Sequence, residues 1–349
     1  MLIINPGSTS TRIALYDQTS PVQVANLSHS ALKLQQFRSI ADQYQFRLQA
    51  VENFLTENGK PELCAAVGRG GLLKPMGSGA YLVNDTMVAD LKRGVQGQHA
   101  SNLGGLLALG AATPRHIPSF IVDPVAVDEF APVARISGLP QIERRSLGHA
   151  LNIRAVARRV ANGMGKDLTA MNFVVAHLGG GISIAPLAGG RILDYNNANE
   201  AGPFSPERAG SLPVGDVVTL TFSGQYTEKE LVKLLNGKAG LVAHLGTNDA
   251  RDAIRRSEAG DQQAALVLDA MAYQIGKEIG AMATVLSGRV DAVILTGGLA
   301  HAQYLTDRIA SHISFIAPVE VVPGEDEMLA LAEGAWLVLS GQEMAKVYH

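Results

Sequence analysis

Short apolar runs alternate along the chain with glycine-containing turns and with longer stretches of helical periodicity. Residues 2–4 and 13–16 are apolar runs on either side of a turn that contains Asn, Pro, Gly and four hydroxyl residues. Two such runs around a polar turn predict a β-hairpin. A second hairpin is predicted where the apolar runs 173–176 and 182–185 flank a turn of three glycines. Polar and small residues therefore gather at the tips of two hairpins, one in each half of the chain.

Small hydrogen-bond donors crowd the tip of the first hairpin. Asn5, Ser8 and Ser10 carry amide or hydroxyl groups, and Gly7 allows backbone N–H groups to approach a ligand closely. Loops of this kind hold oxyanions, phosphate above all. An ordinary polar turn has the same composition, so this loop alone does not identify a phosphate site.

Two further glycine turns strengthen the phosphate interpretation. His177 precedes Gly179, Gly180 and Gly181 at the second hairpin, and the pair Gly297–Gly298 ends an apolar strand before a predicted helix. Two strand–turn–strand hairpins in separate halves, together with a strand–Gly-Gly–helix unit, resemble the layout of the actin-like sugar and acyl kinases. In that layout each half contributes one phosphate hairpin and the nucleotide lies between them.

Strands and helices alternate through the rest of the chain, which predicts an α/β fold. Apolar residues recur at helical spacing over residues 34–55 and again in a long stripe over 261–286. Residues 315–322 are expected to form the closing strand and residues 327–339 the last helix. The helix over 102–112 is rich in small apolar residues, so we expect it to pack closely on a neighbour.

The length of 349 residues is enough for two domains, each with its own core. Proline and glycine make residues 132–145 irregular, and the crossing between domains is expected near there. We predict two actin-like, ribonuclease H-like domains with a nucleotide cleft between them. Residues 1–125 and 328–349 would form the first, with the C-terminal helix returning to it, and residues 126–327 the second.

Composition narrows the classes of partner. The chain is 47% hydrophobic and 17% charged, as in soluble globular proteins, and its net charge of −3 without a basic run gives no reason to expect nucleic acid. The chain has no uninterrupted apolar stretch of about 18 residues, so no membrane span is predicted. A single cysteine, Cys64, excludes an internal disulfide, and with no signal-peptide pattern it favours the cytoplasm. Cys64 lies in an apolar run and is expected to be a buried thiol.

Phosphoryl transfer requires positioning and positive charge on the transferring oxygens. The candidate cations are Arg69 beside a glycine turn, Arg208 in a long Pro/Gly-rich loop, and the imidazole of His149. Asp123, at the end of a predicted strand, and Glu327, opening the last helix, are candidate Mg²⁺ ligands. Each also has an ordinary interpretation, as a capping or solvated arginine, a core histidine, a turn aspartate, or a carboxylate stabilised by a helix dipole.

Competing catalytic motifs are absent from the sequence. We find no G-x-x-x-x-G-K-[ST] and no G-x-G-x-x-G after a strand, which leaves both a P-loop and a dinucleotide-binding domain unsupported. Neither H-E-x-x-H nor a cysteine cluster indicates zinc, and no G-x-S-x-G indicates a hydrolase nucleophile.

Seven segments in order resemble the acetate and butyrate kinase family of actin-like phosphotransferases, and they span nearly the whole chain: 3–11, 67–71, 120–124, 144–152, 177–183, 202–210 and 323–327. The resemblance implies reversible transfer between ATP and a short-chain carboxylate, giving an acyl phosphate and ADP with Mg²⁺, in a homodimer. Acetate, propionate and isobutyrate stay open as alternatives to butyrate. A sugar kinase of the same fold and a non-catalytic ATP-dependent switch are the rival functions.

The resemblance also implies roles for individual residues. Arg69 and Arg208 match arginines that bind the carboxylate and the transferring phosphoryl group, and His149 matches the histidine that hydrogen-bonds the transition state. Asp123 and Glu327 match the metal carboxylates, although Glu325 lies two residues from Glu327. The matching nucleotide-binding residues are Asn5, Ser8, Ser10, His177, Gly179, Gly180 and Gly181 for the phosphates and Asp249, Arg251, Gly297 and Gly298 for adenosine.

Two departures from the family pattern concern the site. Gly148 stands before His149 where an aromatic residue is expected, which would alter the packing of the histidine. Pro6 replaces the small residue usual in the first loop of acetate kinases, and the chain is shorter than theirs. The loop and the length both favour the butyrate branch of the family.

Overall fold

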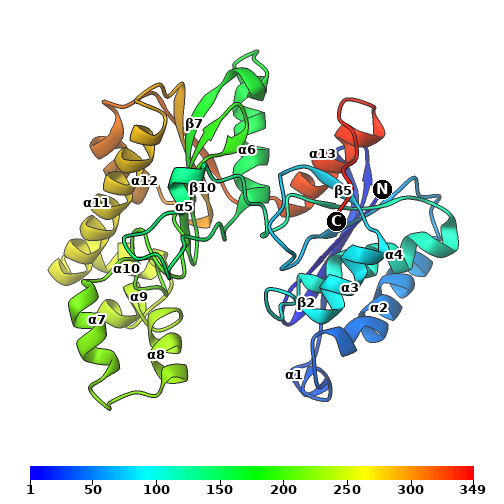
Figure 1. Cartoon of the computed structure of the whole chain (residues 1–349), viewed down its shortest axis with the longest axis horizontal. Coiled ribbons are helices and arrows are strands. Elements are labelled where there is room, and N and C mark those ends of the chain that lie inside the picture. Colours follow the sequence, from blue (N-terminus) through cyan, green and yellow to red (C-terminus); the bar gives the residue numbers. More distant parts are fainter. The chain divides into compact units, whose positions relative to one another are not determined.

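The computed structural model describes all 349 residues, which form two compact units. The first unit contains Met1–Asp128, Ala150–Ala155 and Asp326–His349. The second unit contains Glu129–His149 and Val156–Glu325. Each unit is built around one β-sheet (Figure 1).

The sheet of the first unit has six strands in the order β3-β2-β1-β4-β6-β5. β1 is antiparallel to β2, as the first predicted hairpin requires, and parallel to β4, which in turn is parallel to β6. The carboxyl ends of β1, β4 and β6 therefore lie at one edge of the sheet. The strands are β1 (Leu2–Pro6), β2 (Ser10–Asp17), β3 (Ser20–Ser28), β4 (Ala66–Arg69), β5 (Ala80–Leu82) and β6 (Ser119–Val122).

Helices cover both faces of this sheet. Leu2 and Ile4 on β1 pack in the core with α2, α3 and α4, whereas Ile3 lies in the core on the opposite face with α13. Because successive side chains of a strand point to opposite faces, both of which are covered here, residues 2–4 of β1 are all apolar. The helices are α1 (Ala31–Leu34), α2 (Tyr44–Glu57), α3 (Asp85–Arg93), α4 (Asn102–Ala112) and α13 (Glu327–Leu339), with 3₁₀ turns η1 (Ala41–Gln43) and η2 (Thr113–Arg115).

The helix α4 approaches β4 unusually closely. A Cβ atom at Gly68 would lie 2.0 Å from the carbonyl oxygen of Gly104, and one at Gly104 would lie 2.1 Å from the carbonyl oxygen of Arg69. Only glycine fits at either position, so the close packing predicted for this small-residue helix is confirmed. The contact holds α4 against the end of the strand that carries Arg69.

The sheet of the second unit has the order β11-β10-β7-β8-β9. β7 and β8 form the second predicted hairpin, and β10 is parallel to both β7 and β11. The strands are β7 (Asn172–Leu178), β8 (Ile182–Ala188), β9 (Arg191–Ile192), β10 (Ala292–Gly297) and β11 (Val319–Pro323).

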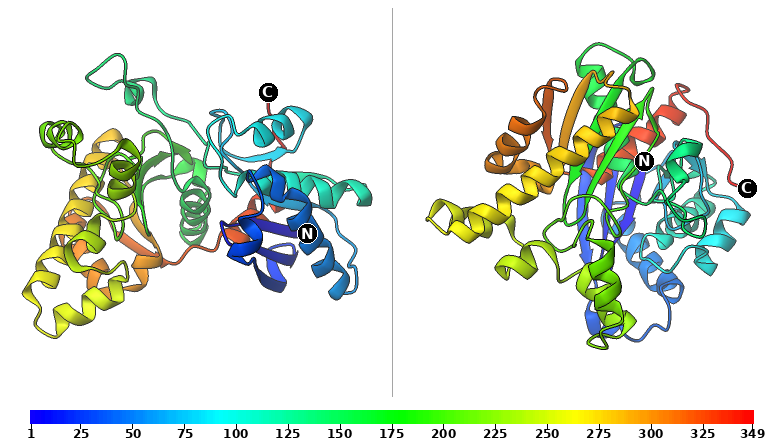
Figure 2. Two further views of the ribbon diagram at one scale, coloured as in Figure 1. Left: turned by 90° about the horizontal axis from the view of Figure 1, so that it is seen from below. Right: turned by 60° about the vertical axis from the view of Figure 1, so that its left-hand side comes forward.

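The long helix α11 (Gln262–Val285) packs its predicted apolar stripe, including Met271 and Ile275, in the core with Val174 and Ala176 of β7. Figure 2 shows this helix in yellow beside the green strands. The other helices are α5 (Pro132–Arg135), α6 (Ala150–Gly163), α7 (Val214–Thr221), α8 (Glu228–Leu235), α9 (Gly240–Leu245), α10 (Ala250–Glu258) and α12 (Gln303–Ile313), with 3₁₀ turns η3 (Leu168–Ala170) and η4 (Gly298–His301).

Three local predictions were wrong. The stripe over 34–55 is not one helix, because Ser39 and Asp42 exchange backbone and side-chain hydrogen bonds that start a new helical segment. The closing strand begins at Val319 rather than at Phe315, whose side chain is exposed. Cys64 is exposed, because it precedes β4 rather than lying within it. No helix combines the length and apolar character needed to cross a bilayer.

Candidate active site

The first hairpin turn presents unused backbone donors. The amide of Gly7 donates to the carbonyl of Ser10 at 2.8 Å, which closes the turn. Ser8 and Thr9 are exposed, and their backbone N–H groups make no hydrogen bond within the chain. Since backbone N–H groups in a concave turn bind anions, this loop has the geometry expected of a phosphate site.

Glu327 gathers two other predicted residues in the first unit. Asn5 donates from Nδ2 to Glu327 Oε2 at 2.6 Å, and Arg69 donates from Nη1 to Glu327 Oε1. Glu327 opens α13, where the helix dipole favours a carboxylate. The Nε of Arg69 is buried without a hydrogen-bond partner. The ends of β1 and β4 and the start of α13 thus meet at one polar cluster.

Asp123 forms hydrogen bonds with other residues than those of that cluster. It follows β6 with a φ of 36°, in the left-handed region that few non-glycine residues adopt. Its Oδ1 accepts from the amide of Gly79 at 2.6 Å and its Oδ2 from Nε of Arg154 at 3.2 Å. Both partners of this ion pair are buried. No hydrogen bond or ion pair joins Asp123 to Glu327.

Sequence reasoning missed Arg154. Its only sequence signal is a charge on α6 close to Leu151 and Ala155, both of which are buried. A buried carboxylate is stable only when it is paired or hydrogen-bonded, and Arg154 meets that requirement for Asp123.

Two histidines stack in the second unit. The rings of His149 and His177 are 3.9 Å apart between centroids and inclined by 11°. Ser183 lies opposite His177 in the β7–β8 register, and its Oγ is 3.0 Å from Nδ1 of His149. His177 Nε2 lies 3.3 Å from Glu325 Oε2. Glu325 therefore accompanies the histidines, whereas Glu327 accompanies Asn5 and Arg69.

Tyr195 explains the glycine before His149. A Cβ atom at Gly148 would lie 1.6 Å from Cε1 of Tyr195, so the tyrosine ring occupies the space that a side chain at position 148 would need. Tyr195 is buried, and burial raises the pKa of its hydroxyl above the ordinary value because the phenolate would be desolvated. A ring from position 195 therefore fills the space beside the backbone of Gly148.

Arg208 lies against the second glycine turn. A Cβ atom at Gly181 would be 2.1 Å from Nη1 of Arg208. Ser205 fixes the loop, because its Oγ donates to the carbonyl of Gly180 at 2.6 Å and accepts from the amide of Arg208 at 3.2 Å. The guanidinium makes no hydrogen bond or ion pair within the chain. Burial lowers the pKa of Arg208, while Glu207 opposes the shift.

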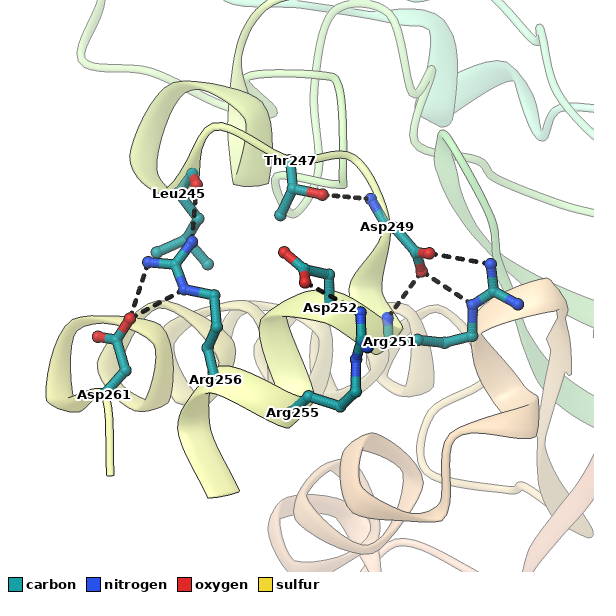
Figure 3. Close-up of polar contacts among 8 residues, drawn as sticks. All are labelled: Leu245, Thr247, Asp249, Arg251, Asp252, Arg255, Arg256 and Asp261. Atoms are coloured by element: carbon teal, nitrogen blue, oxygen red, sulfur yellow. Dashed lines mark hydrogen bonds and ion pairs between the residues drawn. The ribbon is translucent and has the colours of Figure 1, made fainter. Parts of the chain in front are cut away.

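The predicted adenosine residues lie in two places in the second unit. Asp249 caps α10 and pairs with Arg251 through bonds of 3.0 and 2.9 Å (Figure 3). Gly297, at the end of β10, has a φ of 90°, and a Cβ there would lie 2.4 Å from the carbonyl oxygen of Leu178. Gly298 has open space beside it.

No group of three or more His, Cys, Asp or Glu side chains could hold a metal ion by itself. Mg²⁺ in kinases is usually bound through one or two carboxylates, with waters and substrate phosphates completing the octahedron. The partly exposed carboxylate of Glu327, next to the amide of Asn5, fits a metal that arrives with a nucleotide.

Comparisons with known proteins identify the family of the chain. The family model described as "Acetokinase family" matches residues 142–321. "Probable butyrate kinase 2" of Caldanaerobacter subterraneus subsp. tengcongensis is 53% identical over 350 residues, which cover 100% of this chain and 99% of that protein. "Butyrate kinase 2" of Clostridium acetobutylicum is 49% identical over 355 residues, with the same coverage.

A solved structure gives the fold independently of close sequence similarity. The acetate kinase of Porphyromonas gingivalis superposes with a TM-score of 0.80 at 20% identity, over 97% of this chain and 99% of that one. The fold is therefore that of the actin-like phosphotransferases, as predicted.

The chain belongs to the acetokinase family. Membership makes it a kinase that transfers a phosphoryl group between an adenine nucleotide and a carboxyl group, and the predictions of family and reaction type are confirmed.

Proposed function

We propose that this kinase converts butyrate and ATP to butanoyl phosphate and ADP by direct in-line transfer. The observation that carries the proposal is the guanidinium of Arg208, which is half-buried, unpaired and held against the glycine turn 179–181. An unpaired arginine is suited to stabilise charge on a phosphoryl group in transit. The names of the 53% and 49% identical relatives support butyrate as the acid.

In this proposal the predicted residues have different roles in the reaction. Arg69 binds the carboxylate of the acid, while Arg208 and His149 stabilise the transferring phosphoryl group. The stacking of His149 on His177 and its contact with Ser183 hold the imidazole in one orientation. A carboxylate acceptor is already ionised, so the mechanism needs no general base.

The remaining predicted residues bind the nucleotide and metal in this proposal. Bound Mg²⁺ would neutralise charge on the phosphates, with Glu327 and Asp123 as its candidate carboxylates. Asp123 is also held in place by its ion pair with Arg154. We propose a homodimer as the working assembly. The nucleotide residues are Asn5, Ser8, Ser10, His177, Gly179, Gly180 and Gly181 for phosphates and Asp249, Arg251, Gly297 and Gly298 for adenosine.

Hydroxylamine trapping across a series of acids tests the proposal. Acetate, propionate, butyrate, isobutyrate and isovalerate are each supplied with ATP and Mg²⁺, and kcat/KM for hydroxamate formation is compared. We expect the value to peak at butyrate, with about 30-fold or more separating it from acetate, because each of the two additional methylenes in an apolar pocket contributes about 1–3 kcal/mol. A maximum at acetate or isobutyrate would transfer the assignment to that acid.

A sugar kinase of the same fold, the rival named from the sequence, is disfavoured by membership of the acetokinase family and makes a different prediction for one variant. Such an enzyme would use an aspartate to deprotonate a hydroxyl group, so Asp123→Asn would abolish phosphorylation of a sugar. Hydroxamate formation with an acid and no ADP release with sugars would exclude this alternative.

A further inference from the structure

An arginine that sequence reasoning missed lies beneath the first hairpin turn. Arg47 is on α2, and its side chain is completely buried. It falls on the apolar face of the helix, between Tyr44 and Val51. Arginine is almost never fully buried without partners, because desolvating its charge is costly.

All three nitrogen atoms of the Arg47 guanidinium donate hydrogen bonds to oxygen atoms. Nη1 donates to the carbonyls of Gly7 at 2.9 Å and Ser10 at 2.8 Å and to Thr11 Oγ1 at 3.1 Å. Nη2 donates to the carbonyl of Ser8 at 3.2 Å, and Gln43 Oε1 accepts from Nε at 3.0 Å and from Nη2 at 2.9 Å. All these acceptors are neutral.

No carboxylate forms an ion pair with Arg47. Burial lowers the pKa of Arg47, but an arginine side chain stays protonated in proteins. The first unit therefore holds a buried positive charge that is balanced only by amide, carbonyl and hydroxyl dipoles. Such a charge is expensive unless an anion comes near it.

The same contacts determine which way the turn faces. The carbonyls of Gly7, Ser8 and Ser10 point to Arg47, and the carbonyl of Thr9 accepts from the amide of His29 at 2.8 Å. With all four carbonyls engaged on the protein side, the exposed turn presents the free N–H groups of Ser8 and Thr9. Arg47 thus orients an anion-binding turn and places a positive charge behind it.

We propose that Arg47 is the positioning residue of the first phosphate loop and that a nucleotide phosphate is the counter-ion that its buried charge lacks. This inference rests on the proposed function, in which the loop binds ATP phosphates. Arg47 does not touch the ligand. It acts through the backbone of residues 7–10 and through its charge.

Binding of nucleotides to variants at position 47 tests the proposal. Arg47→Gln removes the charge and most of the donors, and we expect the Kd for ATP to rise about 10–100-fold, as for loss of charge-assisted hydrogen bonds. Arg47→Lys retains the charge without the planar fork, so we expect an intermediate loss. The Kd for adenosine, which has no phosphate, should stay within about twofold of the wild-type value.

Arg115→Gln is the matched control, because Arg115 also contacts α2, through an ion pair with Glu52, but lies away from the turn. Its Kd for ATP should equal that of the wild type. A purely structural role for Arg47 predicts a lower Tm with unchanged Kd for ATP in every folded variant, and that result would overturn the proposal. If Arg47→Gln does not fold, Arg47→Lys decides between the two outcomes.

The binding assay also separates this inference from the proposed function. Loss of ATP affinity in the position-47 variants, with no acyl phosphate formed by the wild type from any acid, would retain the role of Arg47 and reject the proposed function. Normal acyl phosphate formation by the wild type, with unchanged ATP affinity in those variants, would retain the proposed function and reject the role of Arg47.

Discussion

The hairpin turns at residues 7–10 and 179–181 each join two antiparallel strands through small residues, but an arginine meets them from different directions. Arg47 is buried behind the first turn and bonds its carbonyls. Arg208 lies against the second turn with its guanidinium unpaired. The difference indicates two roles for arginine at such turns. Arg47 shapes a binding loop, whereas Arg208 is available to a reacting group.

Removing Arg208 should have the largest effect. Arg208→Ala is expected to lower kcat about 10³-fold, as for other arginines that stabilise a transferring phosphoryl group, with little change in the Kd for ATP. Steady-state kinetics and equilibrium binding measure the two quantities. Arg255→Ala is the control, because Arg255 is exposed and paired only with Asp252. Near-wild-type turnover of Arg208→Ala would end the distinction between the two arginines.

The position of Arg208 can also be tested without removing it. Gly181→Ala would place a methyl group 2.1 Å from Nη1 and force the guanidinium to move. A displacement of this size is expected to lower kcat about 10²-fold. Gly280→Ala, where the new methyl group meets open space, should retain full activity. Equal activity of the two alanine variants would show that the position of Arg208 does not matter.

Crowding the space between Gly148 and Tyr195, beside His149, should lower the stability of the fold. Gly148→Ala would put a methyl group 1.6 Å from Cε1 of Tyr195, and overpacking of this kind costs about 1–3 kcal/mol of unfolding free energy. Denaturant titration measures the loss, and Gly163→Ala at the end of α6 is the unhindered control. The second variant Tyr195→Leu should recover part of the loss when combined with Gly148→Ala. No difference between Gly148→Ala and Gly163→Ala would contradict the assignment of Tyr195 to that space.

The smallest expected effect is a pH dependence of stability that arises from His29, beside the first loop. Burial, and then the charge of Arg47, lower the pKa of His29 below its ordinary value of 6.5. His29 Nε2 lies 2.8 Å from Thr11 Oγ1, which also accepts from Arg47. Above pH 6.5 the neutral histidine contributes its full stability, and below it the unfolded chain takes up a proton first, so stability falls.

His29→Gln should remove that contribution to the pH profile. Between pH about 7.5 and 5.5 we expect the wild-type Tm to fall about 1–2 °C more than that of the variant, measured by calorimetry. A variant at His312, which lies on α12 of the second unit, provides the comparison. Parallel profiles for the wild type and His29→Gln would show that His29 does not sense pH.

The sequence predicted the residues whose neighbours are local or belong to recognisable segments. Glu327, Asn5 and Arg69 were each proposed separately, and the structure joins them through hydrogen bonds. The two hairpins and the last helix were also predicted, because their periodicity and turns are local properties.

Residues outside the recognisable segments, whose roles depend on tertiary contacts, could not be found in this way. Arg47 lies on a predicted apolar face, Arg154 beside buried alanine and leucine, and Tyr195 in an irregular loop. A charge at an apolar position is a usable signal for the first two, but it does not identify the partner. The fit of Tyr195 over Gly148 depends on the tertiary fold and has no sequence signal.

The most direct test of the central claim is the stoichiometry of ADP and trapped acyl product in a single turnover with butyrate and hydroxylamine. The account predicts one butyrohydroxamate for each ADP, because the carboxylate is the phosphoryl acceptor. ADP released without hydroxamate would mean that water or another group accepts the phosphoryl, and it would contradict the assignment of this chain as a butyrate kinase.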